Sequence, residues 1–127
     1  MTPDLSAPPP SQGVSPFAGA LEALARHRGV VGALVVSEHD GIVVDAHVHT
    51  GVRAPIVAAL AASLYRKARL SAEAAGLGCA SYVELAASHG RLCMAGRDDT
   101  VLVIIAEPHA SAGLLRVAML RALEAVP

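Results

Sequence analysis

An aspartate and two histidines in the stretch DAHVHT are the residues of this sequence best suited to chemistry. Asp45, His47 and His49 alternate along it, and alternate residues of a β-strand share one face. Such a face could supply imidazole and carboxylate ligands to a zinc ion, as in metal-dependent hydrolases. A catalytic metal centre also needs partners that orient its ligands, and the sequence identifies none. The alternative is an exposed strand face on which two histidines occur by chance.

Residues that other common reactions require are missing. Lys67 is the only lysine, and no glycine-rich loop precedes it, which excludes a phosphate-binding P-loop. No GxGxxG, GxSxG or HExxH motif occurs. The remaining histidines, His27, His39, His89 and His109, fall in predicted loops or at element ends. These motifs therefore indicate no enzyme class, and no cofactor is expected.

Composition narrows the class of protein further. A chain of 127 residues is long enough for one domain with one substantial core. The net charge of -1 and the aromatic content of 2% argue against nucleic-acid binding, which needs clustered cations and stacking rings. Cys79 and Cys93 show neither metal-binding nor disulfide spacing. Because the sequence has no signal peptide and no apolar run of about 20 residues, we expect a cytoplasmic protein that does not insert into membranes.

The pattern of apolar residues predicts the helices and strands. Residues 1–15 are rich in Pro and Ser and are predicted to be a disordered tail, which leaves a domain over 16–127. Ser15 and Pro16 suit the N-cap and first position of a helix that ends near Gly29. Strands are predicted at 30–36, 41–48, 80–87, 91–95 and 100–106, and longer helices at about 55–75 and 111–125. The resulting order is α-β-β-α-β-β-β-α.

Two kinds of strand can be distinguished. Residues 30–36 and 100–106 are apolar at nearly every position, which predicts central strands covered on both faces. Residues 41–48 alternate strictly instead, which predicts an edge strand with Asp45, His47 and His49 on its solvent side. The Asp40-Gly41 pair predicts a hairpin between the first two strands. Short turns make the later neighbours antiparallel as well.

The long helix has two apolar arcs. We expect the larger side chains to face the sheet; these are Ile56, Val57, Leu60 and Leu64. Beside them lies a strip of small side chains, flanked by Tyr65, that comprises Ala58, Ala61, Ala68 and Ala72. One interpretation is simply that alanine is the best helix former. The other is close pairing of this helix with its copy in a homodimer.

Further residues are candidates for contact with a different partner. Arg66 and Arg69 are predicted to be exposed beside the alanine strip. Val117 and Leu120 fall within the charged arc of the last helix, where they either mark a partner contact or are ordinary surface scatter.

The element order and four segments together resemble the Roadblock, or dynein light-chain Roadblock, family. The segments are LARHRGVVGALVVSEHDGIVVDA, VAALAASLYRKA, SYVELAASHGRLCMAGRDDTVLVIIA and GLLRVAMLRALEA. The resemblance covers about residues 17–125 and is greatest to bacterial stand-alone members of MglB type. It implies an α+β, profilin-like fold with a five-stranded antiparallel sheet of order 2-1-5-4-3 and helices on both faces.

The resemblance also implies a function. Members of the family form homodimers, with the third strands joined edge to edge and the long helices paired, and bind Ras-like small GTPases or act as adaptors. It therefore favours a dimer interface at Ala58, Ala61, Tyr65, Ala68, Ala72 and Tyr82. We expect a non-enzymatic homodimeric regulator or adaptor that binds a Ras-like GTPase, either to stimulate its GTP hydrolysis or only to scaffold it, with Arg66, Arg69, Val117 and Leu120 as candidate contacts. The alternatives are a small-molecule sensor and, from His47 and His49, a metal-dependent hydrolase.

Overall fold

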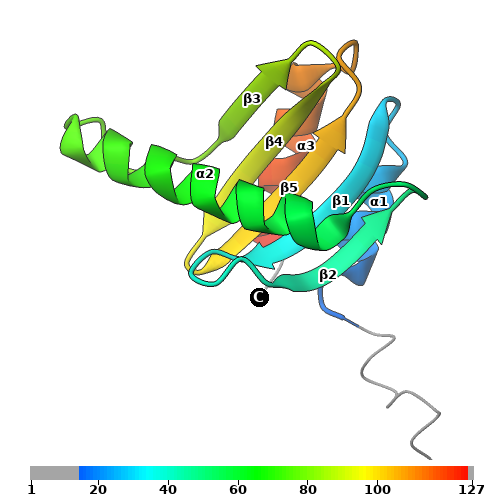
Figure 1. The fold of residues 1–127 in the computed structure, drawn as a ribbon, viewed down its shortest axis with the longest axis horizontal. Helices are drawn as coiled ribbons and strands as arrows, with labels where there is room; N and C mark the ends of the chain where they lie inside the picture. Colours follow the sequence, from blue (N-terminus) through cyan, green and yellow to red (C-terminus); the bar gives the residue numbers. More distant parts are fainter. Residues whose placement is uncertain (1–14, 126–127) are drawn as a thin grey trace, which may run out of the picture.

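A five-stranded sheet lies between one long helix and two shorter ones (Figure 1). The computed structural model describes residues 15–125, so residues 1–14 of the tail predicted over 1–15, and residues 126–127, lie outside the described part. The helices are α1 (Ala18–Ala25), α2 (Ala54–Ala74) and α3 (Ala112–Ala125). The strands are β1 (Val30–Ser37), β2 (Val43–Val48), β3 (Val83–Ala87), β4 (Gly90–Arg97) and β5 (Thr100–Ala106). The predicted element order is confirmed.

All neighbouring strands of the sheet are antiparallel, in the order β2-β1-β5-β4-β3. The predicted fold class and strand order are therefore confirmed. β1 and β5 lie at or beside the centre, and their side chains are buried at almost every position. Because alternate residues of a strand point to opposite faces, these two continuous apolar runs supply both faces of the sheet at once.

The sheet consequently has two cores. On one face, Val35, Cys93 and Ile104 pack under α1 and α3 together with Leu21, Leu115 and Met119 of the helices. On the other face, α2 covers a second cluster. Its sheet residues are Leu34, Val36, Met94, Val101 and Val103, each with no exposed surface. Because the side chains on this face of the sheet are large, they limit the size of the α2 side chains that can pack against the sheet.

The face of α2 that packs on the sheet combines Ala58 and Ala61 of the alanine strip with Val57 and Leu64, so our assignment of the arcs was right for Val57 and Leu64 and wrong for Ile56 and Leu60. Ala58 and Ala61 are fully buried, and Tyr65 is 3% exposed. Ile56 and Leu60, predicted to face the sheet, are 47% and 58% exposed. The sheet already contributes bulky aliphatic side chains, so methyl groups allow the helix to approach closely. The sequence did contain a signal for this packing, because the spacing of Ala58, Ala61 and Tyr65 places them on one face of the helix.

Glycines end α2 as predicted. Gly76 and Gly78 have φ of 75° and 85°, a backbone region that favours glycine. The N–H of Leu77 donates to the Ala72 carbonyl at 2.8 Å, and that of Gly76 to the Glu73 carbonyl at 3.1 Å. These two bonds are those of a Schellman motif. Beyond the sheet, this end of α2 projects from the body of the domain (Figure 1).

Two local predictions were wrong in detail. α1 begins at Ala18 rather than Pro16, because the Ser15 hydroxyl accepts from Phe17 N at 3.1 Å and so caps a turn before the helix. In β2, Val35 faces Asp45 but Val36 faces Val43, so Val44 is an extra, bulged residue. The bulge breaks the expected alternation. It puts Val43 in the core under α2, and leaves Val44 55% exposed.

Candidate functional site

Apolar side chains remain uncovered on the outside of α2 and at the neighbouring edge of the sheet. Ile56 and Leu60 project from α2, and Leu85 on β3 is 48% exposed. β3 is the last strand of the sheet, and within residues 15–125 it pairs only with β4. We call the surface formed by Ile56, Leu60, Leu85 and the free edge of β3 the α2–β3 surface. Apolar groups beside an unpaired strand edge are suited to contact another protein chain.

A groove of about 280 Å³ runs between α2 and the β3–β4 hairpin. It is lined mainly by apolar side chains, including Val57, Leu60, Leu85, Leu92 and Ile105. The groove exists because the small side chains of α2 draw the helix over β1 and β5, while β3 lies at the far edge. The α2–β3 surface therefore combines a hollow, a projecting helix and a strand edge within one continuous area.

On the other side of α2, two arginines bind the turns at one end of the sheet. The Arg66 guanidinium donates to the carbonyl oxygens of Glu38 and, at 3.1 Å, of His39. Arg69 forms an ion pair of 2.8 Å with the Glu38 carboxylate, whose side chain is only 8% exposed. The expectation that Arg66 and Arg69 are exposed was therefore wrong, because both are half-buried against these turns. Both secure α2 to the β1–β2 turn.

Replacing Glu38 with Gln is expected to destabilise the fold by about 1–2 kcal/mol, because Arg69 would lose a buried carboxylate partner. The expected loss of stability is moderate because the Arg69 side chain is 33% exposed, so water would partly replace the lost carboxylate. Chemical denaturation measures the change in the free energy of unfolding. Glu22→Gln is the control, since Glu22 and Arg26 form an exposed pair at i,i+4 of low expected value. Equal effects of the two substitutions would contradict the assignment.

The same end of the sheet brings together a serine, a histidine and two aspartates. The hydroxyl of Ser37 donates to Asp99 Oδ2 at 2.9 Å, and His39 Nδ1 lies 2.9 Å from the same oxygen. His39 Nε2 faces Asp40 Oδ2 at 3.4 Å. In a catalytic triad the serine hydroxyl donates its proton to the histidine ring, whereas here the single hydroxyl proton of Ser37 is donated to Asp99. The cluster therefore ties two turns together rather than activating a nucleophile.

Sequence reasoning missed this cluster, although the strand register contains a signal for it. Ser37 pairs with Thr100 where β1 and β5 meet. The turn that follows β1 and the turn that precedes β5 must therefore lie side by side. A histidine in one and an aspartate in the other are then neighbours although they are 60 residues apart in the sequence.

The pKa of His39 provides a test of this cluster. The hydrogen bond to Asp99, with the negative charges of Asp40 and Asp99, raises the His39 pKa above its usual 6.5. Protonated His39 therefore favours folding, and this contribution is complete below pH 6.5 and lost as the pH rises through the folded-state pKa. An NMR titration of His39 should show the raised pKa. Asp99→Asn should return it toward 6.5; an unchanged pKa in that variant would contradict the assignment.

The residues proposed as metal ligands do not form a cluster. Asp45 and His47 lie opposite Val35 and Ala33, residues of the core beneath α1 and α3, while His49 follows the end of β2. Asp45 Oδ1 accepts from Ala46 N at 2.8 Å. Within residues 15–125, no three His, Cys, Asp or Glu side chains are grouped so that they could hold a metal ion.

The remaining candidate residues are distributed over both faces of the sheet. Ala68 and Ala72 are half-buried on the outer half of α2. Tyr82, expected at the dimer interface, instead packs against the core under α3, where Arg116 lies over its ring at 5.6 Å. Val117 is 49% exposed on α3, whereas Leu120 is half-buried against the core. The structure therefore separates these five residues rather than bringing them together.

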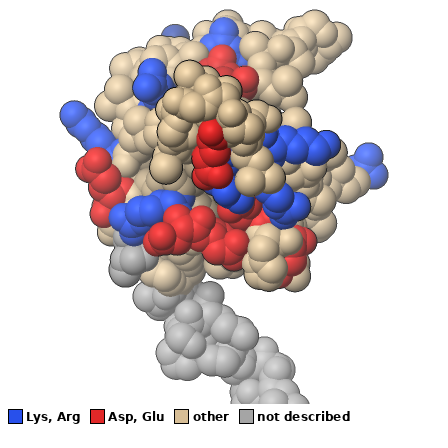
Figure 2. Space-filling view, turned by 90° about the vertical axis from the view of Figure 1, so that its left-hand side faces the viewer, with Lys and Arg blue, Asp and Glu red and all other residues tan. Residues whose placement is uncertain are grey.

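Charged side chains of both signs are mixed at the end of the molecule where α2 terminates. Figure 2 shows acidic and basic groups lying next to one another across the lower half of this view. Such mixing offers no single-sign surface of the kind that binds nucleic acid. No helix in residues 15–125 is long and apolar enough to cross a membrane.

The fold and the exposed α2–β3 surface define an α+β domain with a sheet edge available for protein contact. Residues 18–106 match the Roadblock/LC7 domain family, and the chain belongs to this family. An uncharacterized protein of Methanocaldococcus jannaschii is 28% identical over 103 residues, which cover 81% of this chain and 90% of that protein.

Solved structures agree with this assignment at the level of the fold. A Roadblock/LC7 domain from Streptomyces avermitilis has a TM-score of 0.73 at 23% identity and covers 86% of this chain and 89% of its own. MglB of Myxococcus xanthus has a TM-score of 0.78 at 17% identity, with 88% and 92% covered. The predicted resemblance to Roadblock proteins, including those of MglB type, is confirmed.

Proposed function

We propose that this protein is a non-enzymatic homodimer that binds a Ras-like small GTPase. The observation that carries the proposal is the α2–β3 surface, where Leu60 and Leu85 are 58% and 48% exposed beside an unpaired strand edge. An antiparallel strand can pair with a copy of itself about a two-fold axis. Joining two β3 edges would extend the sheet across the dimer and bring the two α2 helices side by side.

The proposed dimer uses different contact residues from the dimer that the sequence led us to expect. Ala58, Ala61 and Tyr65 pack against the sheet of their own chain. They therefore hold α2 in place and do not themselves contact the partner. Ile56 and Leu60 supply its apolar contacts instead. Ala68 and Ala72 lie in the C-terminal half of α2 and are half-buried, and they remain part of the proposed helix pairing.

The GTPase part of the proposal is supported by membership of the Roadblock/LC7 family. Because Arg66 and Arg69 are engaged by the β1–β2 turn, we do not assign either as an arginine finger. Stimulation of hydrolysis would then come from ordering the catalytic groups of the GTPase itself. Val117 remains a candidate contact because it is exposed on α3.

Two measurements test the proposal separately. Light scattering on the purified full chain should give the mass of a dimer. Calorimetric titration with Ras-like GTPases encoded beside the gene, loaded with GDP or a non-hydrolysable GTP analogue, should detect binding to at least one nucleotide state. A monomer would refute the dimer, and failure to bind any of these GTPases in either state would refute the second part.

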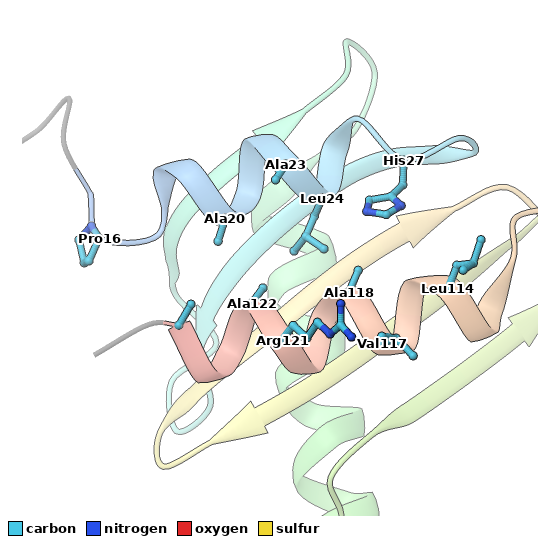
Figure 3. Close-up of a pocket in the computed structure, with 11 residues that line it drawn as sticks. Pro16, Ala20, Ala23, Leu24, His27, Leu114, Val117, Ala118, Arg121 and Ala122 are labelled. Atoms are coloured by element: carbon cyan, nitrogen blue, oxygen red, sulfur yellow. The ribbon is translucent and has the colours of Figure 1, made fainter.

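A small-molecule sensor would need an enclosed apolar pocket. A cavity of about 680 Å³ lies between α1 and α3, but it is an open groove at the surface (Figure 3). The groove lies next to the start of the described chain, which suggests that a segment of polypeptide, rather than a small molecule, occupies it.

A further inference from the structure

The groove between α1 and α3 is an apolar surface on the face of the molecule opposite α2 (Figure 3). Leu24, Ala118 and Ala122 line its floor and walls, and Leu114 and Val117 stand at its side. Leu114 is 66% exposed and Val117 49% exposed. The proposed dimer leaves this face uncovered, since α2 and β3 lie elsewhere. Aliphatic side chains at this exposure are suited to bury a further segment of polypeptide.

Pro16 lines one end of this groove, and only Ser15 separates it from residues 1–14 in the sequence. We propose that residues 4–10 of the same chain, DLSAPPP, bind in the groove. Leu5, Ala7 and the three prolines supply apolar contacts. Gly13 allows the chain to reverse direction just before Pro16. The segment would bind in this way in a monomer or a dimer, with or without a bound GTPase.

The length of this segment fits the groove. The groove follows α3 from Leu114 to Ala125, which at ~1.5 Å per helical residue is a distance of roughly 17 Å. Proline-rich segments favour the extended polyproline conformation, and at ~3.1 Å per residue a bound segment of residues 4–10 would span roughly 19 Å. Residues 11–13 then remain for the reversal. Leu5 would lie near Leu114, at the end of the groove farthest from Pro16.

The charges at that far end complement the segment. Asp4 is the only charged side chain in residues 1–14. Beyond Leu114, the groove meets a second hollow of about 210 Å³ lined by His27, Arg28, His109 and Ser111. Ser111 immediately precedes α3, and the start of a helix favours a negative charge. His109 is paired with Glu107 at 2.9 Å, so Arg28 is the cation we assign to Asp4. Covalent attachment supplies a high effective concentration.

Cysteine accessibility in the full chain tests this binding. In a Cys79→Ser background, Val117→Cys places a thiol in the groove, while Cys93 is fully buried. Glu124→Cys on the same helix is the control, because Glu124 is exposed and does not line the groove. The rate of maleimide modification is measured at both positions with and without Leu5→Asp, which places a charge among the apolar contacts.

We expect Leu5→Asp to raise the modification rate of Val117→Cys by about 5-fold or more, as release of a tethered segment requires, and to leave that of Glu124→Cys unchanged. The protection should also be independent of protein concentration. An equal rate at Val117→Cys with and without Leu5→Asp would overturn the proposal. Protection that disappears on dilution would also overturn it, because the occupant would then be a second molecule. Asp4→Lys should likewise weaken the protection.

Discussion

Replacing Leu60 with Glu is expected to convert the proposed dimer into a monomer while leaving the fold intact. Leu60 is 58% exposed, so within one chain the change places a charge in water at little cost. In the dimer the same side chain would be buried beside its symmetry-related copy. Each dimer contains the substitution twice, and each copy loses ~2 kcal/mol of apolar burial, so the dissociation constant should rise roughly 1000-fold.

Ile42→Glu is the matched control for this experiment. Ile42 is 60% exposed, almost as much as Leu60, but it lies next to β2 at the opposite edge of the sheet. Sedimentation equilibrium of both variants measures the dissociation constants, and circular dichroism checks the fold. If Leu60→Glu remained a dimer, or if Ile42→Glu dissociated instead, the α2–β3 surface would not be the interface.

Gly96→Ala should cause the largest loss of stability from the smallest change of side chain. A methyl group at Gly96 would lie 2.5 Å from Cζ and 2.6 Å from the hydroxyl oxygen of Tyr65. The ring cannot easily move away, because it is 3% exposed and its hydroxyl donates to the Ala80 carbonyl at 3.0 Å. Overpacking of this kind costs about 3 kcal/mol, measured as a fall in the free energy of unfolding.

Gly19→Ala is the matched control, because the same change from glycine to alanine should cause no loss of stability at this position. A methyl group at Gly19 would meet no atom within 4 Å, and in α1 alanine is a better helix former than glycine by about 0.5–1 kcal/mol. Gly19→Ala should therefore be neutral or stabilising. In a Tyr65→Ala background, Gly96→Ala should lose most of its cost. A cost that persisted there would show that contact with Tyr65 is not its cause.

The hydrogen-bonded turns beside α2 could be predicted only in part. The Asp40-Gly41 hairpin was visible in the sequence, and Gly41 has φ of 70° as such a turn favours. The partners of Glu38 and His39 were not visible. They come from α2 and from the turn before β5, which reach this end of the sheet only after the strands have paired. Contacts between segments so far apart leave no local pattern in a single sequence.

The sequence by itself determined the number, type and order of the elements, because these follow from local periodicity and from backbone sterics. The apolar runs of β1 and β5 predicted central strands, and Gly76 and Gly78 predicted the end of α2. Only the tertiary structure decided which arc of α2 faces the sheet. Leu34, Met94 and Val103 already fill that space, so the alanines lie inward and Leu60 lies outward. That choice, made by packing against residues distant in the sequence, exposes the α2–β3 surface.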